Sequence, residues 1–129
     1  MSKVVGTKLI IKDDFNNVLI LKRKVKRGQP ESWCLIGSAV KGKETLEKCV
    51  NRAAKDTIKA LVFDLEELGE YEIDNDTKEK VLVYLGNIKE KPMLDKNYVD
   101  TMWISKRNLS EYNLEDYEKN LLIKYVFVK

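Results

Sequence analysis

The most regular pattern of apolar and small side chains runs through residues 46–61. These side chains recur at intervals of three and four residues, which places them on one face of an α-helix. Before this segment, WCLI at positions 33–36 has the composition of a β-strand, and the loop that follows carries Gly37 and Gly42. The sequence therefore predicts a strand, a glycine-containing loop and an amphipathic helix, an order that often builds a phosphate or metal site. The face of the helix consists of Leu46, Cys49, Val50, Ala53, Ala54, Thr57, Ile58 and Leu61.

Further apolar segments on both sides of this unit predict the remaining elements. Strand-like runs occupy residues 4–11, 17–21, 62–65, 69–73, 80–85 and 99–104, and turn-forming residues fill 13–17 and 74–77. Strands, a helix, more strands and a final helix predict an α+β or mixed α/β fold with helices packed on a sheet. The stripe of the final helix consists of Leu114, Tyr117, Leu121, Leu122, Tyr125 and Val126.

The length and composition predict a single domain over residues 1–129. A chain of 129 residues buries roughly two-thirds of the surface that it exposes when unfolded, which is enough for one hydrophobic core. Its apolar runs are far shorter than the roughly 20 residues that a membrane span needs, and its first residues lack the apolar stretch of a signal peptide. We therefore expect a cytoplasmic protein that does not bind a membrane.

Charge and residue usage limit the chemistry that the chain can perform. It contains no histidine, which excludes a histidine general base, a histidine-dependent triad and histidine metal ligands. Catalysis would have to use carboxylates, lysines, tyrosines or a hard metal ion. The net charge of +3 is too small to indicate duplex nucleic acid as a partner, but it is compatible with a small anionic ligand. Cys34 and Cys49 lack the spacing of a zinc or redox motif, so we interpret them as buried apolar residues.

The loop and helix resemble the Nudix box, whose pattern is G-x5-E-x7-R-E-U-x-E-E-x-G-U, where U is aliphatic. Glu44 and, eight residues later, Arg52 set the register. The resemblance extends over most of the chain and implies an α/β/α sandwich with a mixed β-sheet between helices. The matching segments outside the middle of the box are Trp33-x-Leu35-x-Gly37, Gly42-Lys43-Glu44-Thr45-Leu46, and Asp100-x-x-Trp103-Ile104 followed by Leu109.

The chain departs from the box at the positions that carry the family's chemistry. Ala53 and Thr57 stand where the box has glutamates, Ser38 stands for its first glycine and Lys59 for its last. In the family those glutamates hold Mg²⁺ or Mn²⁺, because carboxylates three and four residues apart project from one side of a helix toward a hard cation. Of the acidic positions in the second half of the box, only Asp56 remains. The metal chemistry is therefore expected to be weakened or lost.

The resemblance assigns roles to a small set of residues. Asp56 and the backbone carbonyl of Gly37 are the candidate metal ligands, with Asp95 or Asp100 as a further carboxylate. The candidate catalytic residues are Asp56, Asp100 and Glu44, with Asp100 as the base that activates water or, alternatively, as a surface charge on a strand edge. Glu44 and Arg52 form a structural bridge between loop and helix in the family, and we favour that interpretation here.

Four residues are candidates for contact with a phosphorylated substrate. Arg23 stands where Nudix strands often carry an arginine, within a basic block at residues 22–27 that either guides a polyphosphate or forms a solvated loop. Lys41 could meet a phosphate as a point charge or only face water. Trp33 and Tyr84 could stack on a base, although core packing is the more common role for such residues.

Two functions follow from these residues. The first is a metal-dependent hydrolase of nucleoside diphosphates linked to another group, active with Mg²⁺ or Mn²⁺ and weakened by the substitutions at Ala53 and Thr57. The second is an inactive module on the same fold that binds a nucleotide or other phosphorylated small molecule, regulates, or contacts another protein. A homodimer is left open in both cases, and no cofactor is expected in the second.

Overall fold

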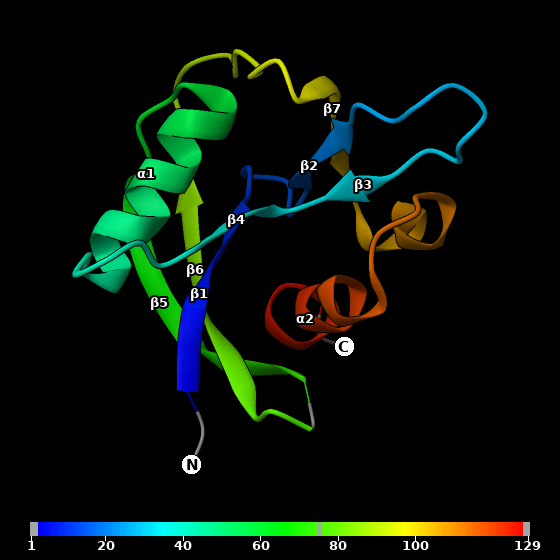
Figure 1. The fold of residues 1–129 in the computed structure, drawn as a ribbon. Coiled ribbons are helices and arrows are strands. Elements are labelled where there is room, and N and C mark those ends of the chain that lie inside the picture. Colours follow the sequence, from blue (N-terminus) through cyan, green and yellow to red (C-terminus); the bar gives the residue numbers. More distant parts are fainter. Residues whose placement is uncertain (1–2, 75, 128–129) are drawn as a thin grey trace.

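The computed structural model describes residues 3–74 and 76–127 of the chain (Figure 1). Two sheets lie at the centre, one helix covers one side of them, and a second helix lies on the other side (Figure 1). The prediction of an α+β fold, arranged as an α/β/α sandwich, is confirmed, although its strands form two sheets. In chain order the elements are β1 (Lys3–Ile11), β2 (Val18–Arg23), β3 (Trp33–Cys34), β4 (Ile36–Ala39), α1 (Leu46–Ile58), β5 (Phe63–Asp74), β6 (Glu79–Asn87), β7 (Tyr98–Ile104), the 3-10 helix η1 (Lys106–Glu111) and α2 (Asp116–Tyr125).

The larger sheet has the strand order β4-β1-β6-β5. Strands β1 and β6 run parallel, whereas β4 and β5 pair antiparallel with their neighbours. Both β1 and β6 are rich in β-branched and other apolar residues, as expected for strands that are covered on both faces. The carboxyl ends of this parallel pair therefore meet at the same edge of the sheet, where the chain continues at Lys12 and Ile88.

The smaller sheet has the order β3-β2-β7, and all its pairs are antiparallel. A turn that the sequence predicts at residues 13–17 leads from β1 into β2. In it, Asp13 Oδ1 accepts hydrogen bonds from the backbone N–H groups of Phe15 at 2.9 Å and Asn17 at 2.8 Å. Asn16 adopts a left-handed backbone with φ of 64°, a conformation that asparagine tolerates better than most residues.

Helix α1 begins and ends at identifiable caps. The Thr45 hydroxyl accepts a hydrogen bond from the Lys48 backbone N–H at 3.2 Å, which satisfies one of the free donors of the first turn. The helix ends at Ile58 because Lys59 turns into the left-handed region, with φ of 53°. The expectation that the helical face extends to Leu61 is therefore wrong: Leu61 lies beyond the helix and is 69% exposed.

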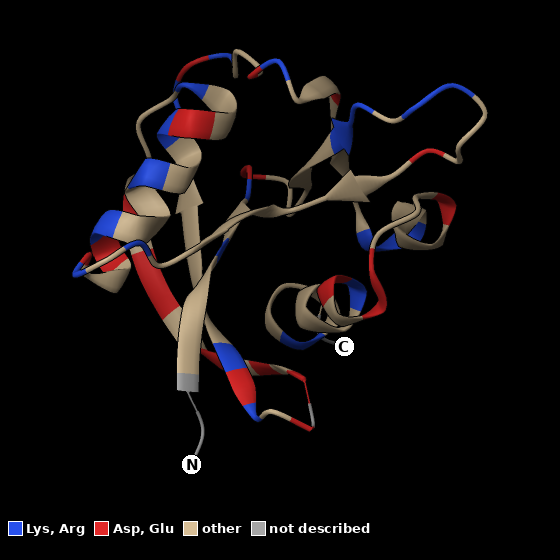
Figure 2. Cartoon of the chain, in the orientation of Figure 1, with Lys and Arg blue, Asp and Glu red and all other residues tan. Residues whose placement is uncertain are grey.

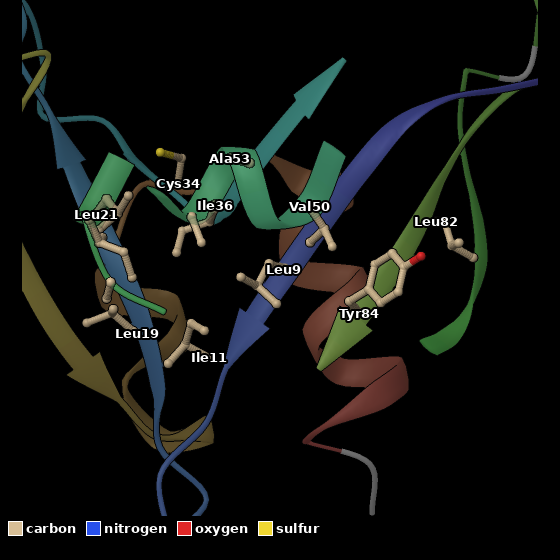
Figure 3. Packing of buried hydrophobic residues seen from close by; sticks show 13 residues of the cluster. Leu9, Ile11, Leu19, Leu21, Cys34, Ile36, Val50, Ala53, Leu82 and Tyr84 are labelled. Carbon is tan, nitrogen blue, oxygen red and sulfur yellow. The ribbon is translucent and has the colours of Figure 1, made fainter. Parts of the chain in front are cut away.

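Two clusters of buried side chains fill the two sides of the larger sheet. On the α1 side, apolar residues of the helix meet Leu9, Ile11 and Leu82 of the strands (Figure 3). On the α2 side, Leu121 and Leu122 pack on Ile10, Val83 and other strand residues. Side chains alternate between the two faces along each strand, so neighbouring residues such as Leu9 and Ile10 belong to different clusters.

The segment between α1 and β6 forms one strand where the sequence predicted two. β5 runs from Phe63 to Asp74, and its register against β6 shifts at three places. Gly69, with φ of 147°, lies at one of these irregularities. In the turn predicted at 74–77, Asp74 Oδ1 accepts from Asp76 N–H at 2.8 Å, whereas Asn75 lies outside the described residues. None of the helices within residues 3–74 and 76–127 has the length and apolar character needed to cross a membrane.

Candidate functional site

Glu44 and Arg52 join the loop to helix α1. Arg52 Nε lies 2.7 Å from Glu44 Oε2, and Arg52 Nη2 lies 2.9 Å from Glu44 Oε1. The same Nη2 donates to the Ser38 hydroxyl at 3.1 Å and to the Ala39 carbonyl at 3.0 Å, so the guanidinium also binds the end of β4. Hydrogen bonding from Arg52 lowers the pKa of Glu44 to about 2. The geometry is that of a structural clasp between strand, loop and helix, and it leaves Glu44 fully engaged.

The two residues that the resemblance aligns with glutamates of the Nudix box point into the core. Ala53 is 2% exposed and Thr57 is 8% exposed, and Ala53 belongs to the apolar cluster under α1 (Figure 3). The Thr57 hydroxyl donates to the Ala53 carbonyl at 2.7 Å, within the helix itself. A threonine that bonds back to the residue four positions earlier is satisfied locally. Neither side chain therefore presents a free oxygen at the surface of the helix.

Asp56 is the remaining carboxylate of the box, and it is exposed. Its Oδ2 lies 3.6 Å from Arg52 Nη1, one turn earlier on the helix. It lines a cavity of about 440 Å³ together with Lys55, Lys59 and Asp95. The loop after β6 forms the other wall, because the backbone N–H groups of Met93 and Asp95 donate to the carbonyls of Ile58 and Thr57 at 2.8 and 3.0 Å.

These residues do not fit the metal site that the resemblance implies. Mg²⁺ prefers near-octahedral oxygen coordination, usually with one or two carboxylates and substrate phosphates. Here Ala53 supplies no oxygen, Thr57 uses its hydroxyl within the helix, and Asp56 lies next to a guanidinium. Within residues 3–74 and 76–127, no group of three or more His, Cys, Asp or Glu side chains is placed to hold a metal ion.

Of the other candidate metal ligands, Asp95 lines the cavity beside Asp56, whereas Gly37 and Asp100 do not. Gly37 pairs with Lys8 across β4 and β1, and a Cβ there would come within 2.8 Å of the Thr7 backbone oxygen and 2.7 Å of Lys8 Cδ, so the close approach of β1 accounts for the glycine. Asp100 pairs with Lys22 across β7 and β2. Lys22 lies on the same face of β2 as Ile20, which packs on the α2 side. Asp100 therefore lies on the face that points away from α1, and its Oδ1 accepts from the Thr101 backbone N–H at 2.8 Å.

The two aromatic candidates for base stacking are core residues in this structure. Trp33 is 5% exposed and packs edge to face on Tyr112, with ring centroids 5.1 Å apart. Its indole Nε1 donates to Glu31 Oε1 at 3.3 Å. Tyr84 is 6% exposed and lies under α1 (Figure 3), where burial raises the pKa of its hydroxyl. Of the two roles that the sequence left open, core packing is therefore the one that both rings have.

The two basic candidates are placed differently from each other. Arg23 ends β2, next to Cys34 of the neighbouring strand, and hydrogen bonding to the Cys34 side chain raises the pKa of Arg23. Lys41 is exposed in the loop before α1, where its backbone N–H donates to Glu44 Oε1 at 3.2 Å. Lys41 is therefore part of the loop structure through its backbone, and its side chain is open to solvent.

A group of basic residues gathers at one end of the molecule, which we call the basic end. It comprises the C-terminal end of α1 and the loops 24–32 and 88–97, drawn with several blue segments in Figure 2. Backbone hydrogen bonds join the parts: Lys24 N–H donates to the Asn97 carbonyl at 2.9 Å, and loop 88–97 bonds to α1 as described. Its basic residues are Lys24, Lys26, Arg27, Lys55, Lys59, Lys89, Lys91 and Lys96, and its acidic residues are Glu31, Asp56, Glu90 and Asp95.

Sequence reasoning missed a buried ion pair on the opposite face. Glu118 of α2 is completely buried, and its Oε2 accepts from Lys8 Nζ and from the Leu35 backbone N–H, both at 3.0 Å. Burial lowers the pKa of Lys8, but the charges of Glu118 and Tyr117 and hydrogen bonding to both side chains together raise it by more, so the net shift is upward. A signal was present in the sequence, because Glu118 lies four residues after Leu114 and four before Leu122, within the apolar stripe predicted for the final helix, although α2 itself begins at Asp116.

Comparisons with known proteins identify the fold. A MutT Nudix hydrolase from Burkholderia pseudomallei is 19% identical with a TM-score of 0.77, covering 98% of both chains. A MutT protein from Methanosarcina mazei is 18% identical with a TM-score of 0.67, covering 95% of this chain and 93% of that one. A Nudix hydrolase from Nitrosomonas europaea is 15% identical with a TM-score of 0.68, covering 86% of this chain and 77% of that one. The chain has the Nudix fold, as its sequence predicts.

The sequence by itself gives no comparable match. A scan against protein-family models finds none, and a search of curated proteins also finds none. Identities below 20% explain this difference, since the fold of a chain is retained over changes that remove most sequence similarity. The likeness to the three structures therefore concerns the fold, and the function has to be argued from this chain's own residues.

Proposed function

We propose that this Nudix-fold chain has lost metal-dependent hydrolysis and binds a nucleotide or other phosphorylated small molecule at its basic end. The observation that carries the proposal is the pair Ala53 and Thr57, which occupy the glutamate positions of the box and are buried. A site that holds phosphates without a metal needs cationic side chains in its place. Lys55 and Lys59 supply such groups at the wall of the cavity beside Asp56.

The end of helix α1 can receive an anion despite the direction of its dipole. The carbonyl end of a helix carries partial negative charge, which disfavours anions. Here the carbonyls of Thr57 and Ile58 already accept backbone N–H groups from loop 88–97, which reduces their negative potential. The lysines of the helix end and of the loop add full positive charges around the same place. The balance of charge therefore favours a phosphate over a metal ion.

Calorimetric titration tests this proposal directly. Protein would be titrated with tripolyphosphate, and then with nucleoside triphosphates, dinucleoside polyphosphates and nucleotide sugars, all in excess EDTA. We expect binding that weakens with added salt, because exposed charges are screened. Replacing both Lys55 and Lys59 by glutamine should weaken it by about a hundredfold or more, since hydrogen bonds to charged groups contribute about 1.5–3 kcal/mol each and about 1.4 kcal/mol is tenfold in affinity. A matched control makes the same change of charge elsewhere: it replaces Lys78, at the other end of the sheet, and Lys119 of α2 by glutamine.

The results separate the proposal from its competitors. Equal loss of affinity in both double variants would reject the basic end as the site. Binding that appears only with Mg²⁺ or Mn²⁺ would reject the proposal that the site binds phosphates without a metal ion. No binding across the panel would favour a protein-interaction module on the Nudix fold.

Residual hydrolysis is the second candidate, and one observation favours it. Asp56 and Asp95 line the same cavity, so two carboxylates are present there even though the box glutamates are not. Product formation from the same panel with Mg²⁺ or Mn²⁺, abolished by Asp56→Asn and retained by Glu47→Gln in the first turn of α1, would support a weak hydrolase. Absence of product under conditions in which the ligand binds would reject it.

A further inference from the structure

A cavity of about 400 Å³ lies at the carboxyl ends of the parallel strands β1 and β6. Lys12 follows β1 directly, Asn87 ends β6 and Lys89 follows shortly after, and all three line the cavity with Trp103 of β7. In open sheets of mixed topology, the crevice outside the carboxyl ends of parallel strands is a frequent place for ligands. Lys89 is also part of the basic end, but none of these residues lines the cavity beside Asp56.

Trp103 gives this cavity an aromatic wall. Trp103 is 37% exposed, whereas Trp33 is 5% exposed and enclosed by the core. A half-exposed indole on a strand offers a flat apolar surface that water solvates poorly. Its neighbours in the cavity are polar, so the wall is suited to a planar ligand that stacks on one face and forms hydrogen bonds at its edges.

The polar lining can both donate and accept hydrogen bonds. Asn87 Nδ2 donates to Asp64 Oδ2 at 2.9 Å, which orients the amide and the carboxylate relative to each other. Asp64 holds a left-handed backbone with φ of 55°, so its position is fixed at a small conformational cost. Lys12 supplies donors at the end of the neighbouring strand β1, and the Lys89 Nζ lies 4.6 Å from the centre of the Phe63 ring.

We propose that this cavity binds a nucleobase, stacked on Trp103 and hydrogen-bonded at its edge by Asp64, Asn87 and Lys12. A base has amino and ring N–H donors for the carboxylate and ring acceptors for the ammonium and the amide. A purely cationic ligand would meet two lysines, and a bare phosphate would meet Asp14 and Asp64. The mixed lining therefore selects an uncharged planar ring with both kinds of group.

Fluorescence of the two tryptophans provides the test, with free nucleosides as probes. Adenosine, guanosine, cytidine and uridine lack phosphate, so the result is independent of the proposed anion site. At least one nucleoside should quench the emission in a saturable way, while ribose 5-phosphate should not. Trp103→Ala should weaken binding measured by calorimetry about tenfold, in keeping with the loss of base stacking, and Trp103→Phe should retain most of it.

Controls distinguish this cavity from a general aromatic effect. Phe15→Ala removes another exposed aromatic ring near the same turn, outside the cavity, and should leave nucleoside affinity unchanged. Asp64→Asn, which keeps a residue that tolerates a left-handed backbone, should change the preference among the four nucleosides. Quenching that stays linear up to the solubility limit, or unchanged affinity in a folded Trp103→Ala variant, would overturn the proposal. The glutamine variant of Lys55 and Lys59 should bind nucleosides as the wild type does.

Discussion

The two faces of the larger sheet each carry a helix that is fastened by a glutamate and a basic residue, but the two fastenings differ in environment. On the α1 face, Glu44 and Arg52 lie at the rim, with side-chain exposures of 14% and 24%. On the α2 face, the Glu118 side chain is fully buried and that of Lys8 is 13% exposed. Ala53 and Thr57, which the resemblance aligns with box glutamates, are thus buried on the α1 face, and the buried carboxylate is on the opposite face.

The two ion pairs also differ in how many contacts support them. The Arg52 guanidinium binds Glu44, Ser38 and the Ala39 carbonyl, so several hydrogen bonds hold the loop in place. Glu118 has two hydrogen-bond donors on one oxygen, and its Oε1 has no partner in the described part of the chain. The α1 clasp can therefore lose one contact with limited effect, whereas the α2 pair depends on both members.

Breaking the buried pair should have the largest effect. Lys8→Met removes the cation and leaves the Glu118 carboxylate buried without compensation, which costs about 3–5 kcal/mol in comparable cases. The free energy of unfolding from urea titration measures this loss. The double variant Lys8→Met with Glu118→Leu should recover most of the stability, because apolar residues of similar volume often replace a buried pair without loss. A double variant as unstable as the single one would show that the pair is favourable in itself.

Restoring carboxylates to the α1 face should have the next largest effect. Ala53→Glu with Thr57→Glu places two acidic groups where the side chains are now buried, so we expect a loss of about 2–4 kcal/mol without metal. If the Nudix box is aligned correctly on α1, Mg²⁺ or Mn²⁺ should restore part of the lost stability. The gain is up to about 2.7 kcal/mol when the metal is in hundredfold excess over its dissociation constant. Thermal unfolding with and without metal measures both changes.

The matched control for this experiment is the double glutamine variant at the same two positions. It has nearly the same volume and should lose similar stability, but metal should not restore it, because an uncharged amide is a poor ligand for a hard cation. A glutamate variant that folds and shows no metal-dependent shift would mean that the box has been placed in the wrong register on α1.

The fold was predictable from the sequence because its signals are periodic. The strands β1, β2, β6 and β7 and both α-helices follow from apolar spacing, and the Glu44 and Arg52 spacing predicts the Nudix fold. Two local features were not predictable in this way. The two strand-like runs in 62–73 join through bulges at which Asp64 and Gly69 have positive φ, and η1 lacks the length that a periodic pattern requires.

The site was predictable only in part, since it depends on which side chains from distant segments meet. The resemblance aligns Ala53 and Thr57 with glutamates of the box, and the structure adds that both are buried. The sequence could not show that Asp100 lies on the other face, because that depends on the pairing of β7 with β2. The Lys8 and Glu118 pair joins residues 110 positions apart, and single charges in apolar stripes do not reveal their partner.

Acid should remove the stability that the clasp of Glu44 and Arg52 contributes. The pKa of Glu44 is about 2 in the folded chain, below the value of roughly 4.3 for an unfolded glutamate. A lowered folded pKa means that this contribution to stability is present above pH ~4.3 and is lost as the pH falls toward 2. The stability of Glu44→Gln should therefore change less over this pH range than that of the wild type. Parallel pH profiles for the two proteins would contradict the assignment.

The smallest effect should come from Lys59, where α1 ends. A non-glycine residue in the left-handed region costs about 1 kcal/mol, and Lys59 holds φ of 53° where the box has glycine. Lys59→Gly should raise the free energy of unfolding by about 0.5–1 kcal/mol. Gly42→Ala is the converse control, because Gly42 has φ of 57° and a Cβ added there would meet no atom within 4 Å, so only backbone strain should lower stability. If Lys59→Gly gains stability but binds tripolyphosphate more weakly, then the lysine at the end of α1 contributes to anion binding at the basic end. Its positive charge would then be retained despite the backbone strain.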